Sequence, residues 1–130
     1  MKQRLAQITL VVRDYDEAIQ FYTETLGFTL REDTKLSETK RWVVLTPRGD
    51  EGCSLLLGKA VNEAQASRIG NQTGGRVFLF LYTDNFKEAH HRLIARNVKI
   101  VRGPSVEEYG TVLVFEDLYG NLIDLIQPNR

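Results

Sequence analysis

The carboxylates Glu107 and Glu108 stand directly before Tyr109 and shortly after a Gly-Pro pair, an arrangement suited to acid–base chemistry. A Gly-Pro pair favours a loop, and loops often carry the side chains that act on a ligand. We therefore expect residues 102–108 to form a loop, and a plain solvated loop is the favoured interpretation. The alternative is a loop that closes over a binding site, with Glu107 or Glu108 as a functional carboxylate.

The two histidines, His90 and His91, are neighbours in the sequence. On a helix, neighbouring side chains point about 100° apart, so these two imidazoles cannot chelate one ion together. His90 also follows Phe86 by four residues, which places it at the edge of an apolar stripe. A packed or surface role is therefore predicted for the histidines, and not catalysis.

Two further carboxylates, Asp14 and Asp84, each stand just before a predicted helix. A short acidic side chain in this position accepts hydrogen bonds from the free amides of the first helical turn. We interpret both aspartates as helix caps and not as a catalytic pair. The turn at residues 116–121, which contains Glu116 and Asp117, is likewise interpreted as ordinary turn chemistry.

The segments that hold these residues are repeated in the chain. Residues 7–28 predict a strand, an acidic turn, a helix and a glycine stop, and residues 76–98 repeat that order about seventy positions later. Asp84 stands in the place of Asp14, and Asn97 takes the role of Gly27 as the helix stop. The chain is thus predicted to be a tandem of two modules.

Hydrophobic alternation and turn residues predict four strands and one helix in each module. In the first strand, Ile8, Leu10 and Val12 share the packed face, and in the first helix, Ile19, Tyr22 and Leu26 form the apolar stripe. The first module's predicted elements are strands at 7–12, 28–35, 41–46 and 53–57, a helix from Tyr15, a hairpin at 37–40 and a turn at 48–52. The second module's predicted elements are a strand and helix within 76–98, and strands at 98–101, 109–115 and 122–127.

These elements define the predicted fold class, an α+β fold of tandem βαβββ modules whose curled mixed sheets form a cleft with the helices outside. We expect one domain over residues 1–130, made of module 1 (1–58), a connector (59–75) with a helical turn at 63–68, and module 2 (76–130). The sheet edges stay open, so pairing with a second chain and a homodimer are expected.

Composition excludes several classes of function. The 130 residues are 42% hydrophobic and carry 17 basic and 17 acidic side chains, and no basic stripe of the kind that binds nucleic acid appears. No apolar run suggests a signal peptide or a membrane helix. Cys53, the only cysteine, is expected to be a small core residue in a reducing compartment, so a cytoplasmic protein is predicted. Phosphate-binding loops, dinucleotide glycine fingerprints, nucleophile elbows and His-Glu-x-x-His are absent from the sequence.

Two stretches resemble the vicinal oxygen chelate superfamily, which includes glyoxalase I, extradiol dioxygenases, and fosfomycin- and bleomycin-resistance proteins. They are residues 11–28 (VVRDYDEAIQFYTETLGF) and 115–126 (FEDLYGNLIDLI). The resemblance covers almost the whole chain and implies the paired βαβββ fold. The motifs lie on packing and turn positions, so they carry little information about chemistry.

The resemblance also implies where metal ligands would stand: on the first and fourth strands of each module, here Gln7, Leu56, Arg76 and Asp124. Leu56 has no donor atom, and the guanidinium of Arg76 has no lone pair to give and adds positive charge. The usual metal is therefore not expected, although Gln7 and Asp124 are candidate ligands should a divalent ion bind. We expect Arg76 and Asp124 instead to form an ion pair at the cleft floor.

Alternation along the strands assigns the remaining cleft residues and gives an apolar, aromatic pocket with a few polar groups, as small-molecule sites have. Phe78, Phe80 and Tyr82 are assigned to the face of Arg76. The expected ligand-binding residues are Gln7, Thr9, Trp42, Leu56, Arg76, Phe78, Phe80, Tyr109 and Asp124.

Three functions remain open. The first is a metal-independent protein that binds a small anionic or aromatic molecule, as resistance proteins of this fold sequester drugs. The second is a divalent-metal-dependent lyase, isomerase or dioxygenase, similar to lactoylglutathione lyase, with Gln7, Asp124 and a loop carboxylate as ligands. The third is an interaction protein whose cleft is a packed core. We expect the first, with no cofactor and with a small molecule as partner.

Overall fold

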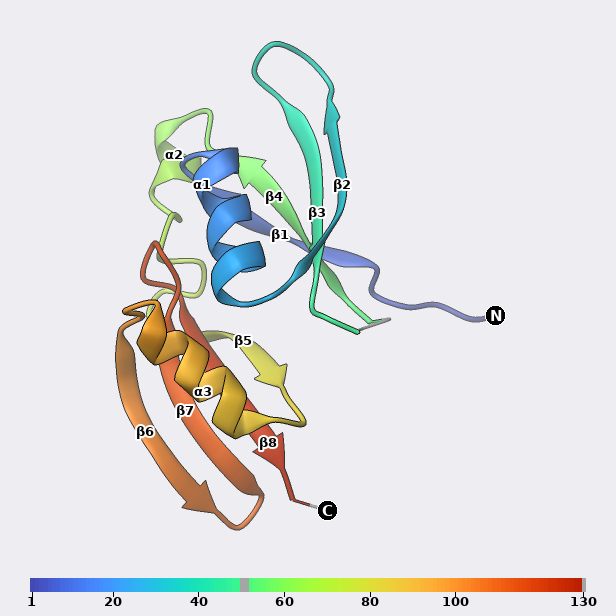
Figure 1. Cartoon of the computed structure of the whole chain (residues 1–130). Coiled ribbons are helices and arrows are strands. Elements are labelled where there is room, and N and C mark those ends of the chain that lie inside the picture. The colour runs from blue at the N-terminus through green and yellow to red at the C-terminus, as the bar shows by residue number, and fades with distance from the viewer. Residues whose placement is uncertain (50–51, 130) are drawn as a thin grey trace. The chain divides into compact units, whose positions relative to one another are not determined.

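The computed structural model describes residues 1–49 and 52–129, which divide into two compact units at residues 1–69 and 70–130. Each unit is one four-stranded mixed sheet with a helix across one face (Figure 1). The predicted α+β fold class and the βαβββ order of both modules are confirmed.

In the first unit, the sheet order is β1-β4-β3-β2, with β1 and β4 parallel and the other pairs antiparallel. The elements are β1 (Gln7–Val12), α1 (Tyr15–Gln20), η1 (Phe21–Thr25), β2 (Thr29–Lys35), β3 (Arg41–Thr46), β4 (Ser54–Lys59) and α2 (Glu63–Ala66).

The second unit repeats this topology with the order β5-β8-β7-β6, where β5 and β8 are the parallel pair. Its elements are β5 (Val77–Tyr82), α3 (Phe86–Ala95), β6 (Ile100–Glu107), β7 (Gly110–Glu116) and β8 (Leu122–Pro128).

The core of each unit lies between the sheet and its long helix. In the first unit, Leu10, Val12 and Leu45 are fully buried, and so is Tyr22 from the helical segment. Thr9 is exposed between the half-buried Ile8 and the buried Leu10, and Val12 is buried as well, which agrees with the alternation predicted for the first strand. We call the face of each sheet away from α1 or α3 its distal face.

The first helix begins as predicted, with the Asp14 carboxylate accepting a hydrogen bond from the Glu17 amide at 2.9 Å. It then widens into the π-helical turn η1, where the Leu26 amide donates to the Phe21 carbonyl five residues earlier. Gly27, at φ 78°, ends the helix as expected.

The widened turn changes which side chains face the sheet. The buried residues of the helical segment are Tyr15, Ala18, Tyr22 and Thr25, whereas Ile19 and Leu26 are only half-buried. Of the predicted stripe, only Tyr22 is fully buried. Leu26 follows the π turn, which shifts later residues by one place relative to a regular helix, whereas Ile19 lies before that turn and its partial exposure has another cause.

The same extra residue explains a second correction. The N-cap of α3 is Asn85, whose side chain accepts from the Glu88 amide at 3.2 Å, and not Asp84 as expected. Asn85 follows Asp14 by 71 residues, but the left-handed helix stop Asn97 (φ 58°) follows Gly27 by 70. The repeat offset changes by one within the helix, because the first unit holds one more residue there. Aligning both modules at seventy therefore misplaced the residues before α3.

The loop expected at residues 102–108 is instead most of strand β6, an edge strand of its sheet. Two irregularities of register, on either side of Arg102, accommodate the Gly103-Pro104 pair, since proline is tolerated at edges and bulges. Glu107 pairs with Gly110, so only Glu108 and Tyr109 remain as the hairpin tip. Among the described residues, this segment is therefore neither the expected solvated loop nor the lid that was its alternative.

Smaller expectations had mixed outcomes. The helical turn in the connector is α2, capped by Asn62. Cys53 is exposed, so its predicted place in the core was wrong. Part of the expected turn at 48–52 lies outside the described residues, at positions 50 and 51. Across 1–49 and 52–129, every helix is too short or too polar to span a bilayer.

Candidate functional site

A row of paired residues crosses the distal face of the first sheet, and we call it the Leu56 row. Strand register places Leu56 beside Thr9 in β1 and beside Val44 in β3, and Val44 in turn beside Glu32 in β2. Leu56 is half-buried and Val44 is buried, so the middle of the row is apolar. Glu32 accepts a hydrogen bond from Thr34 at 3.2 Å, which satisfies the one charged group in the row.

The equivalent row of the second sheet, the Asp124 row, is chemically different. Asp124 pairs with Phe80 in β5 and with Val114 in β7, and Val114 pairs with Arg102 in β6. Phe80 is 63% exposed, and its neighbour on the same face, Tyr82, is 67% exposed. Two aromatic side chains therefore lie open to solvent next to an acidic group.

Asp124 is the most unusual group on this face. Its Oδ1 atom is buried and has no hydrogen-bond partner within residues 1–49 and 52–129. Burial raises the pKa of the Asp124 carboxyl above its ordinary value, and the positive charge of Arg102 offsets part of that rise. An unsatisfied buried acceptor costs about 1–3 kcal/mol, so a group that donates to Oδ1 would be stabilising.

The expected ion pair between Arg76 and Asp124 is not formed. Arg76 is exposed and precedes β5, and its carbonyl accepts a hydrogen bond from the Thr73 hydroxyl. A bulge between Val77 and Leu79 breaks the alternation on which the assignment of Arg76 relied. Phe78 lies in this bulge without a register partner, so it does not share the regular alternation of Phe80 and Tyr82.

Sequence reasoning missed Arg102 because it placed this residue in a loop. Arg102 is exposed, and in the described part of the chain its recorded interaction is the charge effect on Asp124. Only the strand pairing of β6 with β7 brings it into the Asp124 row. Local sequence carried no signal for this, since a Gly-Pro pair normally argues against a strand.

The other expected residues are divided between the units. Gln7 is half-buried at the start of β1, on the same distal face as Thr9. Trp42 is half-buried and shares the face of Val44, and nearby the hydroxyls of Thr46 and Ser54 lie 2.8 Å apart and hydrogen-bond each other. Tyr109 is 59% exposed at the tip of the β6–β7 hairpin, where its carbonyl accepts from the Asn129 amide.

The residues present do not fit the divalent metal that the fold family implies. Of the four positions that the resemblance implies, Leu56 has no donor atom, and Arg76 is a cation that lies before β5. Among these four positions, only Gln7 and Asp124 offer an oxygen. Within the described ranges, no three His, Cys, Asp or Glu side chains gather in one place. Two oxygens fall short of the three or four protein ligands that hold a zinc ion in its usual sites.

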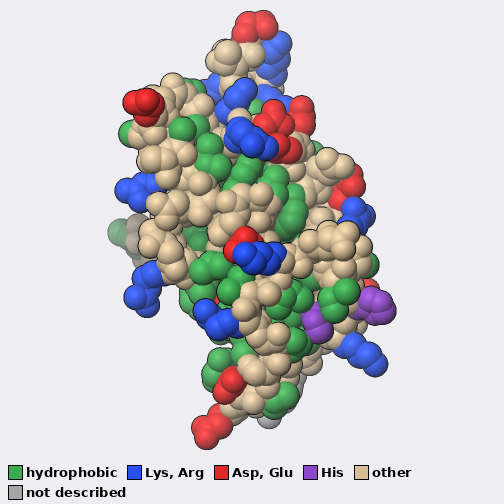
Figure 2. Space-filling model, turned by 90° about the vertical axis from the view of Figure 1, so that its left-hand side faces the viewer, with side chains coloured by type: hydrophobic (Ala, Val, Ile, Leu, Met, Phe, Trp, Pro, Cys, Tyr) green, Lys and Arg blue, Asp and Glu red, His purple; other side chains and the backbone are tan. Residues whose placement is uncertain are grey.

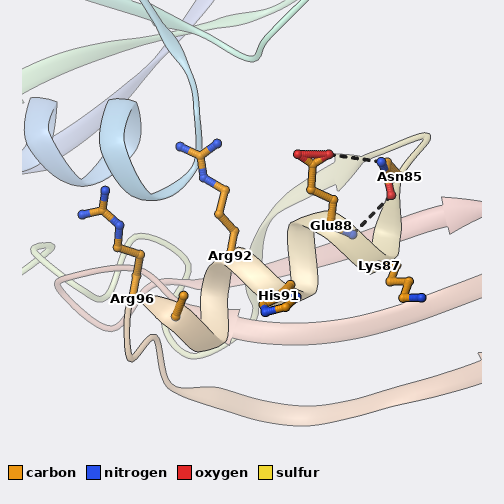
Figure 3. Close-up of a pocket in the computed structure, with 7 residues that line it drawn as sticks. Asn85, Lys87, Glu88, His91, Arg92 and Arg96 are labelled. Atoms are coloured by element: carbon orange, nitrogen blue, oxygen red, sulfur yellow. Dashed lines mark hydrogen bonds between the residues drawn. The ribbon is translucent and has the colours of Figure 1, made fainter.

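A shallow hollow of about 670 Å³ lies along α3, on the side opposite its buried residues Phe86 and Leu93 (Figure 3). Its lining residues are Asn85, Lys87, Glu88, His91, Arg92, Ala95 and Arg96. The Glu88 side chain accepts from Asn85 at 3.1 Å as part of the helix cap. His90 is half-buried with its ring centroid 5.9 Å from that of Phe86, and His91 is exposed, which are the packed and surface positions predicted for them. Figure 2 shows histidine side chains on the surface beside lysine or arginine. The hollow contains none of the expected site residues, so the distal faces are the stronger candidate.

Known proteins share this sequence and this architecture. A protein of Shewanella frigidimarina (strain NCIMB 400) is 56% identical over 130 residues, which cover 99% of this chain and 96% of the relative. The crystal structure of UcmS2 superposes with a TM-score of 0.82 at 31% identity and covers 97% of this chain and 98% of its own. TnmS3, an antibiotic binding protein from Streptomyces sp. CB03234, gives a TM-score of 0.77 at 29% identity over 98% of both chains.

Residues 4–125 match the model of one family. That match agrees with the two βαβββ units and with the structural neighbours, one of which is itself titled a glyoxalase/bleomycin resistance protein. The chain therefore belongs to the Glyoxalase/Bleomycin resistance protein/Dioxygenase superfamily.

Proposed function

We propose that the protein binds a small anionic or aromatic molecule on the distal faces of its sheets, without the divalent metal of its enzymatic relatives. The observation that carries the proposal is the exposure of Phe80 and Tyr82 beside a carboxylate that lacks a hydrogen-bond partner. Exposed aromatic groups next to a few convergent polar groups are typical of small-molecule sites. The likeness to TnmS3, an antibiotic binding protein, supports the same class of function.

The proposal extends to how the protein exists in the cell. The open strand edges favour a homodimer, and the two units acting together as one domain are part of the proposal. The exposed free thiol of Cys53 favours a reducing compartment such as the cytoplasm.

A metal-dependent lyase, isomerase or dioxygenase is the second candidate. The unpartnered Oδ1 atom of Asp124 favours it, because an unsatisfied carboxylate oxygen is a ready ligand for a hard cation. On this alternative, Gln7 and Asp124 would need further ligands from elsewhere.

One experiment separates the candidates. Protein purified without an affinity tag is assayed for bound metal, and its thermal unfolding is followed with nickel, zinc, manganese, iron(II), chelator and a library of aromatic acids and antibiotics. We expect substoichiometric metal, no effect of chelator, and a rise in Tm of several degrees with some library members, since a ligand that binds the native state stabilises it. Stoichiometric metal with a chelator-sensitive Tm would favour the enzyme, and no shift with either would favour a packed core.

Two variants locate the binding. Phe80→Ala should reduce the ligand-induced rise in Tm, because it removes an exposed aromatic surface. Val106→Ala is the matched control: Val106 is 82% exposed and pairs with Thr111, which places it on the opposite face of the same sheet. Equal shifts in both variants would place the ligand elsewhere.

A further inference from the structure

The Asp124 row carries two charged groups of opposite sign at a fixed spacing. Arg102 and Asp124 pair with the same residue, Val114, from the two neighbouring strands. Because adjacent strands lie about 4.8 Å apart, their Cα atoms are separated by roughly 10 Å across the sheet. Phe80 continues the row on the far side of Asp124.

Both charged groups lack direct partners. The Oδ1 atom of Asp124 accepts no hydrogen bond, and Arg102 makes no hydrogen bond or ion pair, in the part of the chain that the structure describes. They do not satisfy each other, since no ion pair joins them. A carboxylate accepts hydrogen bonds, whereas a guanidinium donates them in a fork that matches a carboxylate. The row therefore presents an acceptor and a donor in one line.

We infer that the Asp124 row recognises an aromatic acid that also carries a hydroxyl or amine, with Asp124 accepting a hydrogen bond from that donor and Arg102 donating to the acid. The inference rests on the proposed function and names its ligand class. The aromatic ring of the ligand lies over Val114, which is buried and apolar. The end of the ring that bears the hydroxyl or amine contacts Phe80. Arg102 and Asp124 are thus the residues that determine specificity.

The Leu56 row explains why the recognition belongs to one unit. At the corresponding positions it has Glu32, Leu56 and Thr9, so it offers neither a cation for an acid nor a free carboxylate for a donor. An acidic ligand lying across the Leu56 row would be repelled by Glu32, because two negative charges close to each other repel.

Four naphthalene compounds test the inference on the full chain. The probe with both groups is 6-hydroxy-2-naphthoic acid, and the probes that each lack one are 2-naphthol, 2-naphthoic acid and 6-methoxy-2-naphthoic acid. Binding is measured by titration calorimetry or by the probes' fluorescence. We expect the first compound to bind about tenfold or more tightly than the others, as one charge-assisted hydrogen bond allows.

Variants assign each contact. Arg102→Met should weaken the binding of all three naphthoic acids and leave that of 2-naphthol unchanged. Asp124→Leu, which copies the residue of the Leu56 row, should erase the advantage of the hydroxyl over the methoxy compound. Asp124→Asn keeps one acceptor oxygen and should retain part of that advantage. Arg31→Met, which changes an exposed arginine in β2, is the matched control and should change nothing.

The outcomes separate this inference from the proposed function. Equal affinities of the four probes, no binding of any of them, or losses in Arg102→Met that are the same for 2-naphthol would overturn the inference. If library ligands still raise the Tm and Phe80→Ala still reduces that rise, the proposed function stands while this ligand class is wrong. If no library member binds, both fail together.

Discussion

The two sheets share one strand order but differ in the chemistry of the row that crosses each distal face. The Leu56 row runs Glu32, Val44, Leu56, Thr9, and the Asp124 row runs Arg102, Val114, Asp124, Phe80. Only the buried valine is common to both. In the first unit the one charge is hydrogen-bonded, whereas in the second unit opposite charges stand apart beside an exposed aromatic ring.

The difference teaches that the repeat conserves packing and leaves the distal face free to vary. The helix-covered faces hold fully buried residues in both units, Leu45 in one and Phe115 in the other. These positions must exclude water for either unit to fold. The distal rows are under no such constraint. The Leu56 row can therefore stay mostly apolar, while the Asp124 row carries unsatisfied charged groups that are suited to binding.

Leu56→Asp is the change expected to have the largest effect on this comparison. The new carboxylate would share a row with Glu32 and not with an arginine, and the change removes a half-buried leucine. We expect the free energy of unfolding in urea to fall by about 2–3 kcal/mol at neutral pH. Leu56→Asn, the uncharged control, should lose less free energy of unfolding than Leu56→Asp. Equal losses in the two variants would show that the charge is unimportant.

Asp124→Asn is expected to act in the opposite direction. Burial raises the pKa of Asp124 in the folded state, so ionisation costs stability as the pH rises from the ordinary aspartate pKa, about 3.9, through the folded value. The variant has no such loss, and we expect it to be more stable by about 1 kcal/mol at pH 7. The gain should vanish below pH 4. If Asp124→Asn raised the free energy of unfolding by the same amount at every pH, the ionisation of Asp124 would not be the cause.

The helix caps test the alignment of the two units. Asp14→Ala and Asn85→Ala should each lower the free energy of unfolding by about 1 kcal/mol, because each removes an acceptor for a first-turn amide. Asp84→Ala is the control and should leave stability unchanged in thermal unfolding. If Asp84→Ala lowered the free energy of unfolding as much as Asn85→Ala, the equivalence of Asp14 and Asn85, 71 residues apart, would be contradicted.

The smallest effect is expected on the side of the first sheet that faces α1. Arg41 donates to both oxygens of Asp33, at 3.1 and 2.7 Å, and this contact holds the pKa of Asp33 below its ordinary value. Its stabilisation is present above the ordinary aspartate pKa and is lost as the pH falls below it. Because the side chains of Arg41 and Asp33 are still 26% and 31% exposed, water screens their attraction, and Asp33→Asn should cost only about 0.5 kcal/mol at pH 7. A cost that persists at pH 2 would contradict the charge-based explanation.

Local patterns in the sequence determined the elements of this protein. Alternation of apolar residues defined β1, and a run of β-branched and aromatic residues before Pro47 defined β3. Turn residues marked the helix ends at Gly27 and Asn97, and the repeat of these patterns gave the βαβββ units. These features depend on neighbours within a few positions, and such patterns are written directly in the chain. The absence of a metal-donor atom at Leu56 was also readable, since it depends only on side-chain chemistry.

Tertiary structure alone decided which residues share the distal row. A π turn in one helix and a bulge in β5 each shifted the alignment by one position, and this moved the N-cap from Asp84 to Asn85 and removed Arg76 from the site. A one-residue change of register turns side chains to the other face of a sheet, and nothing local signals it. Arg102 joined Asp124 only because β6, β7 and β8 pair side by side, a result of hydrogen bonds between strands that the sequence does not specify residue by residue.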